Sequence, residues 1–177
     1  MENQIKKIVL IGPESTGKST LCNMLAEKYD GIVVPEFARE YLMQKGSQYN
    51  FDALLDIAKG QQELEEKLLF NSNKQIAFID TDMYVIKVWC EFVFDNCHHW
   101  ILNQITEMHC DLYLLCNTDI PWVKDELREY PDNTTRQRLY HHYKDIMINQ
   151  QVPWVEISGG YEERFEKATV AIDRFLK

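Results

Sequence analysis

The sequence lacks any apolar run long enough to cross a membrane. A membrane-spanning helix needs about 18 or more consecutive apolar residues, and none of the 177 residues belongs to such a stretch. The basic N-terminal residues 1–7 are followed by only a short apolar run, residues 8–11, which is too brief for the core of a signal peptide. We therefore expect a cytoplasmic protein without a membrane partner.

Positive charge is also scarce. The chain has 19 Lys and Arg against 28 Asp and Glu, which gives a formal net charge of −9 at pH 7. A surface of this kind repels the phosphate backbone of nucleic acids. We expect no nucleic-acid partner, although a local basic pocket for a phosphorylated small molecule is compatible with the overall charge.

Paired cysteine motifs, repeats and linkers are missing as well. The five cysteines include no Cys-x-x-Cys pair, and an odd set of thiols is typical of a reducing compartment. The Cys and His residues at 97–99 and 109–110 do not have the spacing of a zinc site. With no repeat or low-complexity tract, we expect residues 1–177 to form a single domain; its oligomeric state is left open.

The motif with the clearest chemistry is Gly-x-x-x-x-Gly-Lys-Ser at residues 12–19. It follows a short apolar run and precedes an amphipathic pattern, and the order strand, loop, helix is that of a P-loop. In such a loop Lys18 reaches the β- and γ-phosphates of ATP, and the Ser19 hydroxyl binds Mg²⁺. The predicted nucleotide-binding residues of the loop are Gly12, Glu14, Ser15, Thr16, Gly17, Lys18, Ser19 and Thr20.

Short apolar runs alternate with helical patterns along the whole chain. The predicted strands are residues 6–11, 32–34, 75–82, 111–116 and 153–157, and each segment between two of them contains a helical pattern. This alternation predicts an α/β three-layer sandwich, in which helices cover both faces of a five-stranded parallel sheet. In the long helix of residues 51–70, we expect Asn50 to be the N-cap and Gly60 to mark a bend.

Charged residues follow two of the other predicted strands. Ligands of an open parallel sheet bind beyond the carboxyl ends of the strands, where Glu36, Arg39, Asp80 and Asp82 fall. Asp80 is the expected Walker B ligand of Mg²⁺, and Asp82 either caps the next helix or touches the substrate. The alternative for Glu36 and Arg39 is a surface ion pair one helical turn apart.

Residues 119–138 form a polar segment that we expect to act as a lid. Pro121 interrupts regular structure, and Arg136 and Arg138 fall in the first turn of a helix, where the helix dipole disfavours cations. Together with Arg128 they predict a lid whose arginines close over transferring phosphates. The alternative is a solvated charged face.

These features together predict a small-molecule kinase of the P-loop type. Phosphoryl transfer needs neutralised phosphate charge and a group that orients or deprotonates the attacking hydroxyl. Glu36 is the best candidate for that base, with Asp80 and Asp82 as rivals. The predicted catalytic residues are Lys18, Glu36, Asp80, Arg128 and Arg136.

Four blocks of sequence resemble one family. Residues 12–20, 34–42, 80–82 and 119–128 occur in the same order in NadR-type ribosylnicotinamide kinase domains, which make nicotinamide mononucleotide from nicotinamide riboside and ATP. The resemblance extends from about residue 8 to about residue 138, and more loosely to the end. It implies a P-loop kinase fold with an Arg-bearing lid, ATP and Mg²⁺ as cofactors, and a nucleoside acceptor.

The resemblance also implies a substrate pocket, in which Trp122 would stack on a flat cationic pyridinium ring. Its residues would be Glu14, Glu36, Arg39, Asp80, Asp82 and Trp122. The adenine of ATP would lie near Arg128 and the turn that contains Ser158 and Gly159. A carboxylate beside phosphates is unfavourable unless it faces a cation, so we expect Glu14 to face Mg²⁺ or a cationic acceptor.

Two activities of longer family members are not expected. These members carry a nucleotidylyltransferase domain with a His-x-Gly-His motif, and some carry a DNA-binding helix-turn-helix. The His pairs at 98–99 and 141–142 do not supply that motif, so we expect neither adenylyl transfer nor repression on DNA. The alternatives to a ribosylnicotinamide kinase are a kinase for another nucleoside or small metabolite, and an ATP-binding regulatory module with little turnover.

Overall fold

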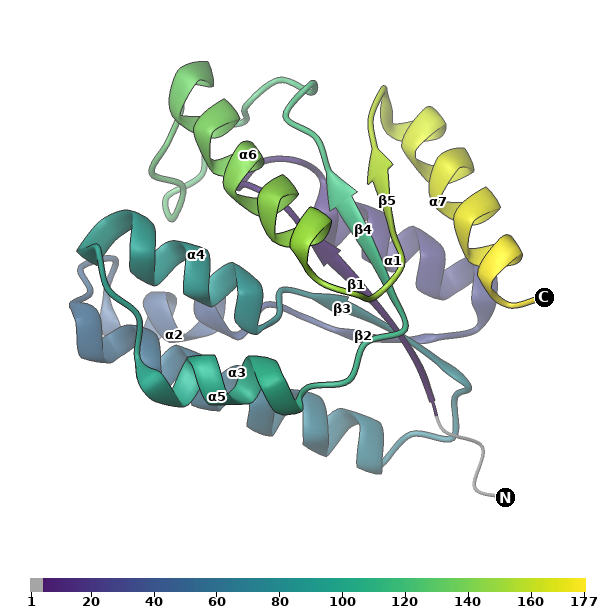
Figure 1. Cartoon of the computed structure of the whole chain (residues 1–177), viewed down its shortest axis with the longest axis horizontal. Helices are drawn as coiled ribbons and strands as arrows, with labels where there is room; N and C mark the ends of the chain where they lie inside the picture. The colour runs from purple at the N-terminus through teal and green to yellow at the C-terminus, as the bar shows by residue number, and fades with distance from the viewer. Residues whose placement is uncertain (1–4) are drawn as a thin grey trace.

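The fold is seen in a computed structural model that describes residues 5–177 (Figure 1). Residues 1–4, where we placed the beginning of the domain, lie outside the described residues. The strands are β1 (Lys6–Ile11), β2 (Ile32–Val34), β3 (Ile76–Asp80), β4 (Leu112–Cys116) and β5 (Trp154–Ile157). The helices are α1 (Lys18–Tyr29), α2 (Phe37–Lys45), α3 (Phe51–Phe70), α4 (Met83–Phe94), α5 (His99–Glu107), α6 (Asn133–Asn149) and α7 (Tyr161–Phe175).

The five strands form one parallel sheet in the order β2-β3-β1-β4-β5. β1 lies in the middle, with Leu10 opposite Asp80 of β3 on one side and opposite Leu114 of β4 on the other. The loop that follows β1 therefore begins between the carboxyl ends of β3 and β4. This is the position at which parallel α/β sheets bind their ligands, and the predicted fold class is confirmed.

Helices cover both faces of the sheet, as Figure 1 shows. Alternate residues of β1 point to opposite faces, so that Leu10 packs with α1 and α7 whereas Ile11 packs with α4 and α6. Both side chains are buried, so this part of β1 has to be apolar on both faces. The continuous apolar run that identified the first strand follows from this double burial.

A third apolar cluster lies away from the sheet and joins α2, α3, α4 and α5. Asn50 caps α3 as predicted, since its side chain accepts a hydrogen bond from the Ala53 amide at 2.9 Å. α3 is continuous from Phe51 to Phe70, so Gly60 does not interrupt the helix, and the predicted bend stays a prediction. Gly60 makes room for the Phe37 ring: a Cβ at residue 60 would lie 2.1 Å from the ring's Cε1 atom.

No helix within residues 5–177 is both long and apolar enough to span a membrane. The cytoplasmic location stays a prediction.

We predict that Gly60→Ala destabilises the fold, although alanine is the better helix former by about 1 kcal/mol. The added methyl group would collide with the Phe37 ring, and such overpacking lowers the free energy of unfolding by about 1–3 kcal/mol. Urea unfolding measures the change. The matched control is the same substitution in a Phe37→Leu background, where it should be neutral or stabilising. Equal losses in both backgrounds would contradict the steric explanation.

Candidate active site

The P-loop turns tightly between β1 and α1. Gly12 has a φ of 136°, and a Cβ at this position would lie 2.5 Å from the carbonyl oxygen of Cys116, so only glycine fits. The Lys18 Nζ donates hydrogen bonds to the carbonyl oxygens of Gly12 at 3.0 Å and Pro13 at 2.8 Å. The lysine is thus held by the loop itself, next to the space a phosphate would fill.

Ser19 and Asp80 meet at the start of α1. The Ser19 hydroxyl donates a hydrogen bond to Asp80 Oδ2, and the other carboxylate oxygen, Oδ1, is buried without a partner among the described residues. A hydroxyl and a carboxylate with a spare buried oxygen are hard oxygen donors of the kind that Mg²⁺ prefers. The two residues therefore fit the magnesium role that the sequence predicted for them.

Both carboxylate oxygens of Asp82 accept hydrogen bonds from other parts of the fold. One of its oxygens accepts hydrogen bonds from the Tyr84 and Val85 amides, and the other accepts one from the Tyr113 hydroxyl at 2.7 Å. Burial raises the pKa of the Asp82 carboxyl to about 6, against these hydrogen bonds, which lower it. The capping interpretation is confirmed, and Asp82 is absent from the lining of the cavity in which we expected it to touch substrate.

A cavity of about 500 Å³ opens beside the P-loop. It is bounded by the loop, the residues after β2 and β3, α2, α4 and the lid. The predicted residues that it brings together are Gly12, Glu14, Ser15, Thr16, Gly17, Lys18, Ser19, Thr20, Glu36, Arg39, Asp80 and Arg128. A volume of this size suits a nucleoside-sized ligand.

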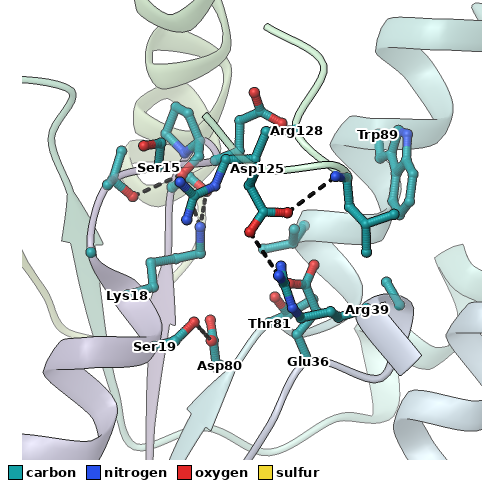
Figure 2. A pocket seen from close by; sticks show the side chains of 18 of the residues that line it. Ser15, Lys18, Ser19, Glu36, Arg39, Asp80, Thr81, Trp89, Asp125 and Arg128 are labelled. Atoms are coloured by element: carbon teal, nitrogen blue, oxygen red, sulfur yellow. Dashed lines mark hydrogen bonds and ion pairs between the residues drawn. The ribbon is translucent and has the colours of Figure 1, made fainter. Parts of the chain in front are cut away.

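Glu36 extends into the cavity from the residue before α2 (Figure 2). No hydrogen bond to its carboxylate is formed within the described chain. Burial raises the pKa of Glu36 and the nearby Asp80 carboxylate raises it further, whereas Lys18 and Arg39 act in the opposite direction. The predicted alternative, a surface ion pair with Arg39, is wrong because Arg39 pairs with Asp125 of the lid at 2.7 Å.

An aromatic wall that no sequence pattern had indicated borders the same cavity. Trp89 and Phe92 of α4 line the cavity together with Tyr130 of the lid. The Trp89 ring is fixed by a hydrogen bond from its Nε1 to the Tyr49 hydroxyl at 2.8 Å (Figure 2 shows the ring). Trp122, the aromatic that the resemblance implied, is not part of the lining. The spacing of Trp89 and Phe92, one helical turn apart, was the available signal.

The lid arginines occupy three different environments. Arg128 lines the cavity and donates a hydrogen bond to the Val123 carbonyl at 2.6 Å. Arg136 is buried behind the P-loop, where it donates to the carbonyl oxygens of Ser15 and Ile120, and burial lowers its pKa. Arg138 lies over the Phe92 ring. The structure does not support the catalytic role predicted for Arg136. Its guanidinium hydrogen-bonds to backbone carbonyl oxygens and does not line the cavity, so it positions the P-loop.

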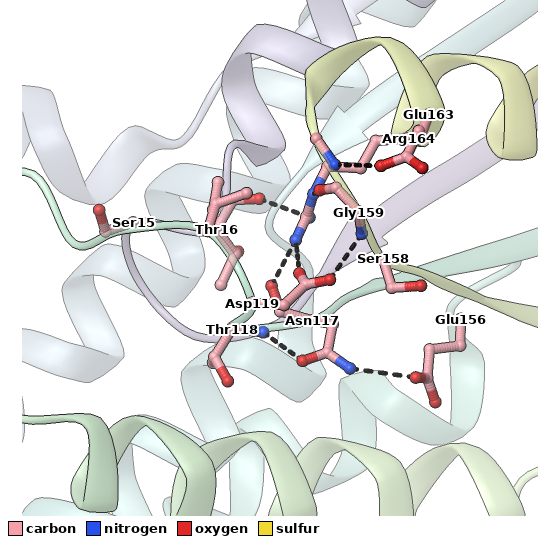
Figure 3. A network of polar contacts seen from close by, with 12 residues as sticks. Ser15, Thr16, Asn117, Thr118, Asp119, Glu156, Ser158, Gly159, Glu163 and Arg164 are labelled. Carbon is pink, nitrogen blue, oxygen red and sulfur yellow. Dashed lines mark hydrogen bonds and ion pairs between the residues drawn. The ribbon is translucent and has the colours of Figure 1, made fainter.

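A second polar network holds the P-loop from the side of β4 and β5 (Figure 3). Buried Arg164 of α7 donates to the carbonyl oxygens of Thr16 at 3.0 Å, Asn117 at 2.9 Å and Gly159 at 2.7 Å, and it pairs with Asp119. Ser158 and Gly159 were predicted to lie near adenine, and neither lines the cavity. Gly159 belongs to this network, whereas Ser158 accepts hydrogen bonds from Lys167 Nζ. Arg164 was missed because, in sequence, it is one more charge on an amphipathic helix.

We predict that Arg164→Met lowers the free energy of unfolding by about 2–4 kcal/mol. Removing one partner of a fully buried ion pair costs about 3–5 kcal/mol; here the Asp119 side chain is 37% exposed and partly solvated. Arg164→Lys should restore little of the lost free energy of unfolding, since an ammonium group cannot reach several carbonyl oxygens at once. Chemical denaturation checks both, with Arg174→Met on the exposed face of α7 as the control. A loss no larger than the control's would contradict the assignment.

Comparison with known proteins identifies relatives of this arrangement. The family model described as "AAA domain" matches residues 7–164. The trifunctional NAD biosynthesis/regulator protein NadR of Salmonella typhimurium is 27% identical over 180 residues, covering 97% of this chain and 43% of that protein. The chain thus spans less than half the length of this curated relative.

Solved structures share the fold. A crystal structure of NadR in complex with NR superposes with a TM-score of 0.82 at 22% identity, covering 97% of this chain and 49% of that one. Thymidylate kinase from Ehrlichia chaffeensis gives a TM-score of 0.67 at 15% identity, covering 97% and 98% of the two chains. The similarity to NadR is confirmed, and the fold is one that P-loop kinases use.

Proposed function

We propose, from the premise that this chain belongs to the AAA domain family, that it is an ATP-dependent kinase. Its reaction would convert nicotinamide riboside to nicotinamide mononucleotide, and the cytoplasm would be its site. The observation that carries the proposal is the lining of the cavity. Lys18 of the P-loop, the Ser19–Asp80 pair and the Glu36 carboxylate, which has no partner among residues 5–177, border the same space.

The donor end of the cavity suits a triphosphate. The P-loop amides and Lys18 would hold the phosphates, and Arg128 would offset charge that develops during transfer. Ser19 and Asp80 would hold Mg²⁺, which supplies neutralisation of the phosphate oxygens when bound. In-line transfer then requires only that an acceptor hydroxyl be brought to the γ-phosphate and lose its proton.

Glu36 is the best candidate for the proton acceptor. Its two rivals have other partners, since Asp80 accepts a hydrogen bond from Ser19, and Asp82 accepts hydrogen bonds from Tyr113 and from amides at the start of α4. A raised pKa also brings Glu36 closer to neutral pH, where a general base works best. Glu36 would accept the hydrogen bond, and transiently the proton, of the attacking ribose hydroxyl.

The acceptor end suits a flat cationic base. The aromatic wall of Trp89, Phe92 and Tyr130 offers ring faces, and the carboxylates of Glu36 and Glu129 add negative charge. Such a chamber attracts a pyridinium ring through stacking and cation–π contact. The related NadR binds nicotinamide riboside, which supports the same acceptor here.

We predict that nicotinamide riboside stimulates ATP-dependent ADP release more than adenosine, uridine or no acceptor does. A coupled assay of ADP release measures this, with Lys18→Ala as the control for contaminating kinases. Greater stimulation by an ordinary nucleoside would identify a kinase of different acceptor specificity. ATP binding without stimulation by any acceptor would reject the kinase and indicate a regulatory module.

We predict that Glu36 sets the acid limb of the pH profile of kcat/KM. The base must be ionised, and because its pKa is raised, activity should be lost on acidification at a higher pH than for a solvent-exposed glutamate. Glu36→Gln should lower kcat about 10²–10⁴-fold and abolish this limb, whereas Glu36→Asp should keep a limb at reduced rate. An unchanged limb in Glu36→Gln would show that another group is the base.

A further inference from the structure

Glu14 occupies a variable position of the P-loop pattern, and its carboxylate accepts hydrogen bonds from the lid. Oε1 accepts hydrogen bonds from the Tyr130 amide at 2.7 Å and from the Trp122 indole at 3.1 Å. Oε2 accepts one from the Glu129 amide at 3.0 Å. All three donors belong to residues 122–130, which we call the lid segment. These lid N–H groups hydrogen-bond to both carboxylate oxygens of Glu14, which also borders the cavity; that Glu14 faces Mg²⁺ or a cationic acceptor stays a prediction.

Ser15 holds the other end of the same segment. Its hydroxyl oxygen accepts a hydrogen bond from the Val123 amide at 2.9 Å. Two consecutive P-loop side chains thus bind the lid segment near both of its ends. Among residues 5–177, two other polar contacts join this segment to the rest of the domain. They are the Arg39–Asp125 ion pair, in which the arginine side chain is 52% exposed, and a hydrogen bond from the Tyr49 hydroxyl to Glu129. Exposed pairs of this kind contribute little.

Arg128 lies between the two attachment points. It borders the cavity with Lys18, and its guanidinium donates to the Val123 carbonyl within the segment. Where this guanidinium lies therefore depends on where the segment lies. The carboxylate of Glu14 is the largest fixed contact between the segment and the loop that cradles phosphates, since charge-assisted hydrogen bonds are roughly twice as strong as neutral ones.

We propose that Glu14 is a positioning residue that fixes the lid segment on the P-loop, so that Arg128 is aimed into the cavity before substrates bind. The kinetic consequence rests on the proposed kinase function, and the structural consequence does not. Preorganised positive charge of this kind lowers the barrier to phosphoryl transfer because it needs no rearrangement during the reaction.

Hydrogen exchange of the ligand-free protein tests the structural part. In Glu14→Ala the amides of Glu129 and Tyr130 lose their acceptor, and we expect their exchange to accelerate about 10-fold or more, as for locally opened segments. Glu14→Gln keeps one weaker acceptor oxygen and should give an intermediate increase. Amides of β1 and β4 should keep their protection. Glu126→Gln, an exposed lid carboxylate outside the cavity lining, is the matched control.

A double-mutant cycle tests whether Glu14 acts through Arg128. With the acceptor that supports most turnover, Glu14→Ala and Arg128→Ala should each lower kcat, and the double variant should be no slower than Arg128→Ala. Additive losses, or unchanged exchange at residues 129 and 130 in Glu14→Ala, would overturn the proposal. If no acceptor supports turnover, the kinase function fails while the exchange experiment still decides the role of Glu14.

Discussion

The site depends on the pairing of β1 with a strand on each side. Because β1 lies between β3 and β4, the loop that leaves it is bordered by the ends of both neighbours. The register that places Leu10 opposite Asp80 brings a carboxylate from a distant part of the sequence next to Ser19. The contact of Gly12 with the Cys116 carbonyl arises on the other side in the same way. Without this central strand, the P-loop and Asp80 would not lie side by side.

Much of the fold could be predicted because its signals are local. Apolar runs buried on both faces identified the strands, and the P-loop pattern identified the turn after β1. Asn50 and Asp82 were predicted as helix caps because a cap is a contact with residues only two or three positions away. The association of Ser19 with Asp80 followed from the rule that ligands bind at the carboxyl ends of parallel strands.

The remainder depends on contacts between segments that no local pattern determines. Trp122 and Trp89 are equally aromatic in sequence, and only the docking of the lid decides which one borders the cavity. The close contact of Gly60 with the Phe37 ring could not be predicted, because Phe37 is far away in sequence. The hydrogen bonds from the lid to Glu14 could not be predicted, because the amides that donate them belong to a segment more than a hundred residues later.

The two buried arginines have a consequence for the backbone they hold. Arg136 binds the carbonyl of Ser15 and Arg164 binds the carbonyl of Thr16, so consecutive peptide groups are anchored by their oxygen atoms. In a trans peptide the N–H points opposite to the C=O, which turns the amides of Thr16 and Gly17 away from the arginines. The orientation of these two dipoles is therefore fixed when the chain folds, and an incoming anion has less conformational entropy to remove from the loop that receives it.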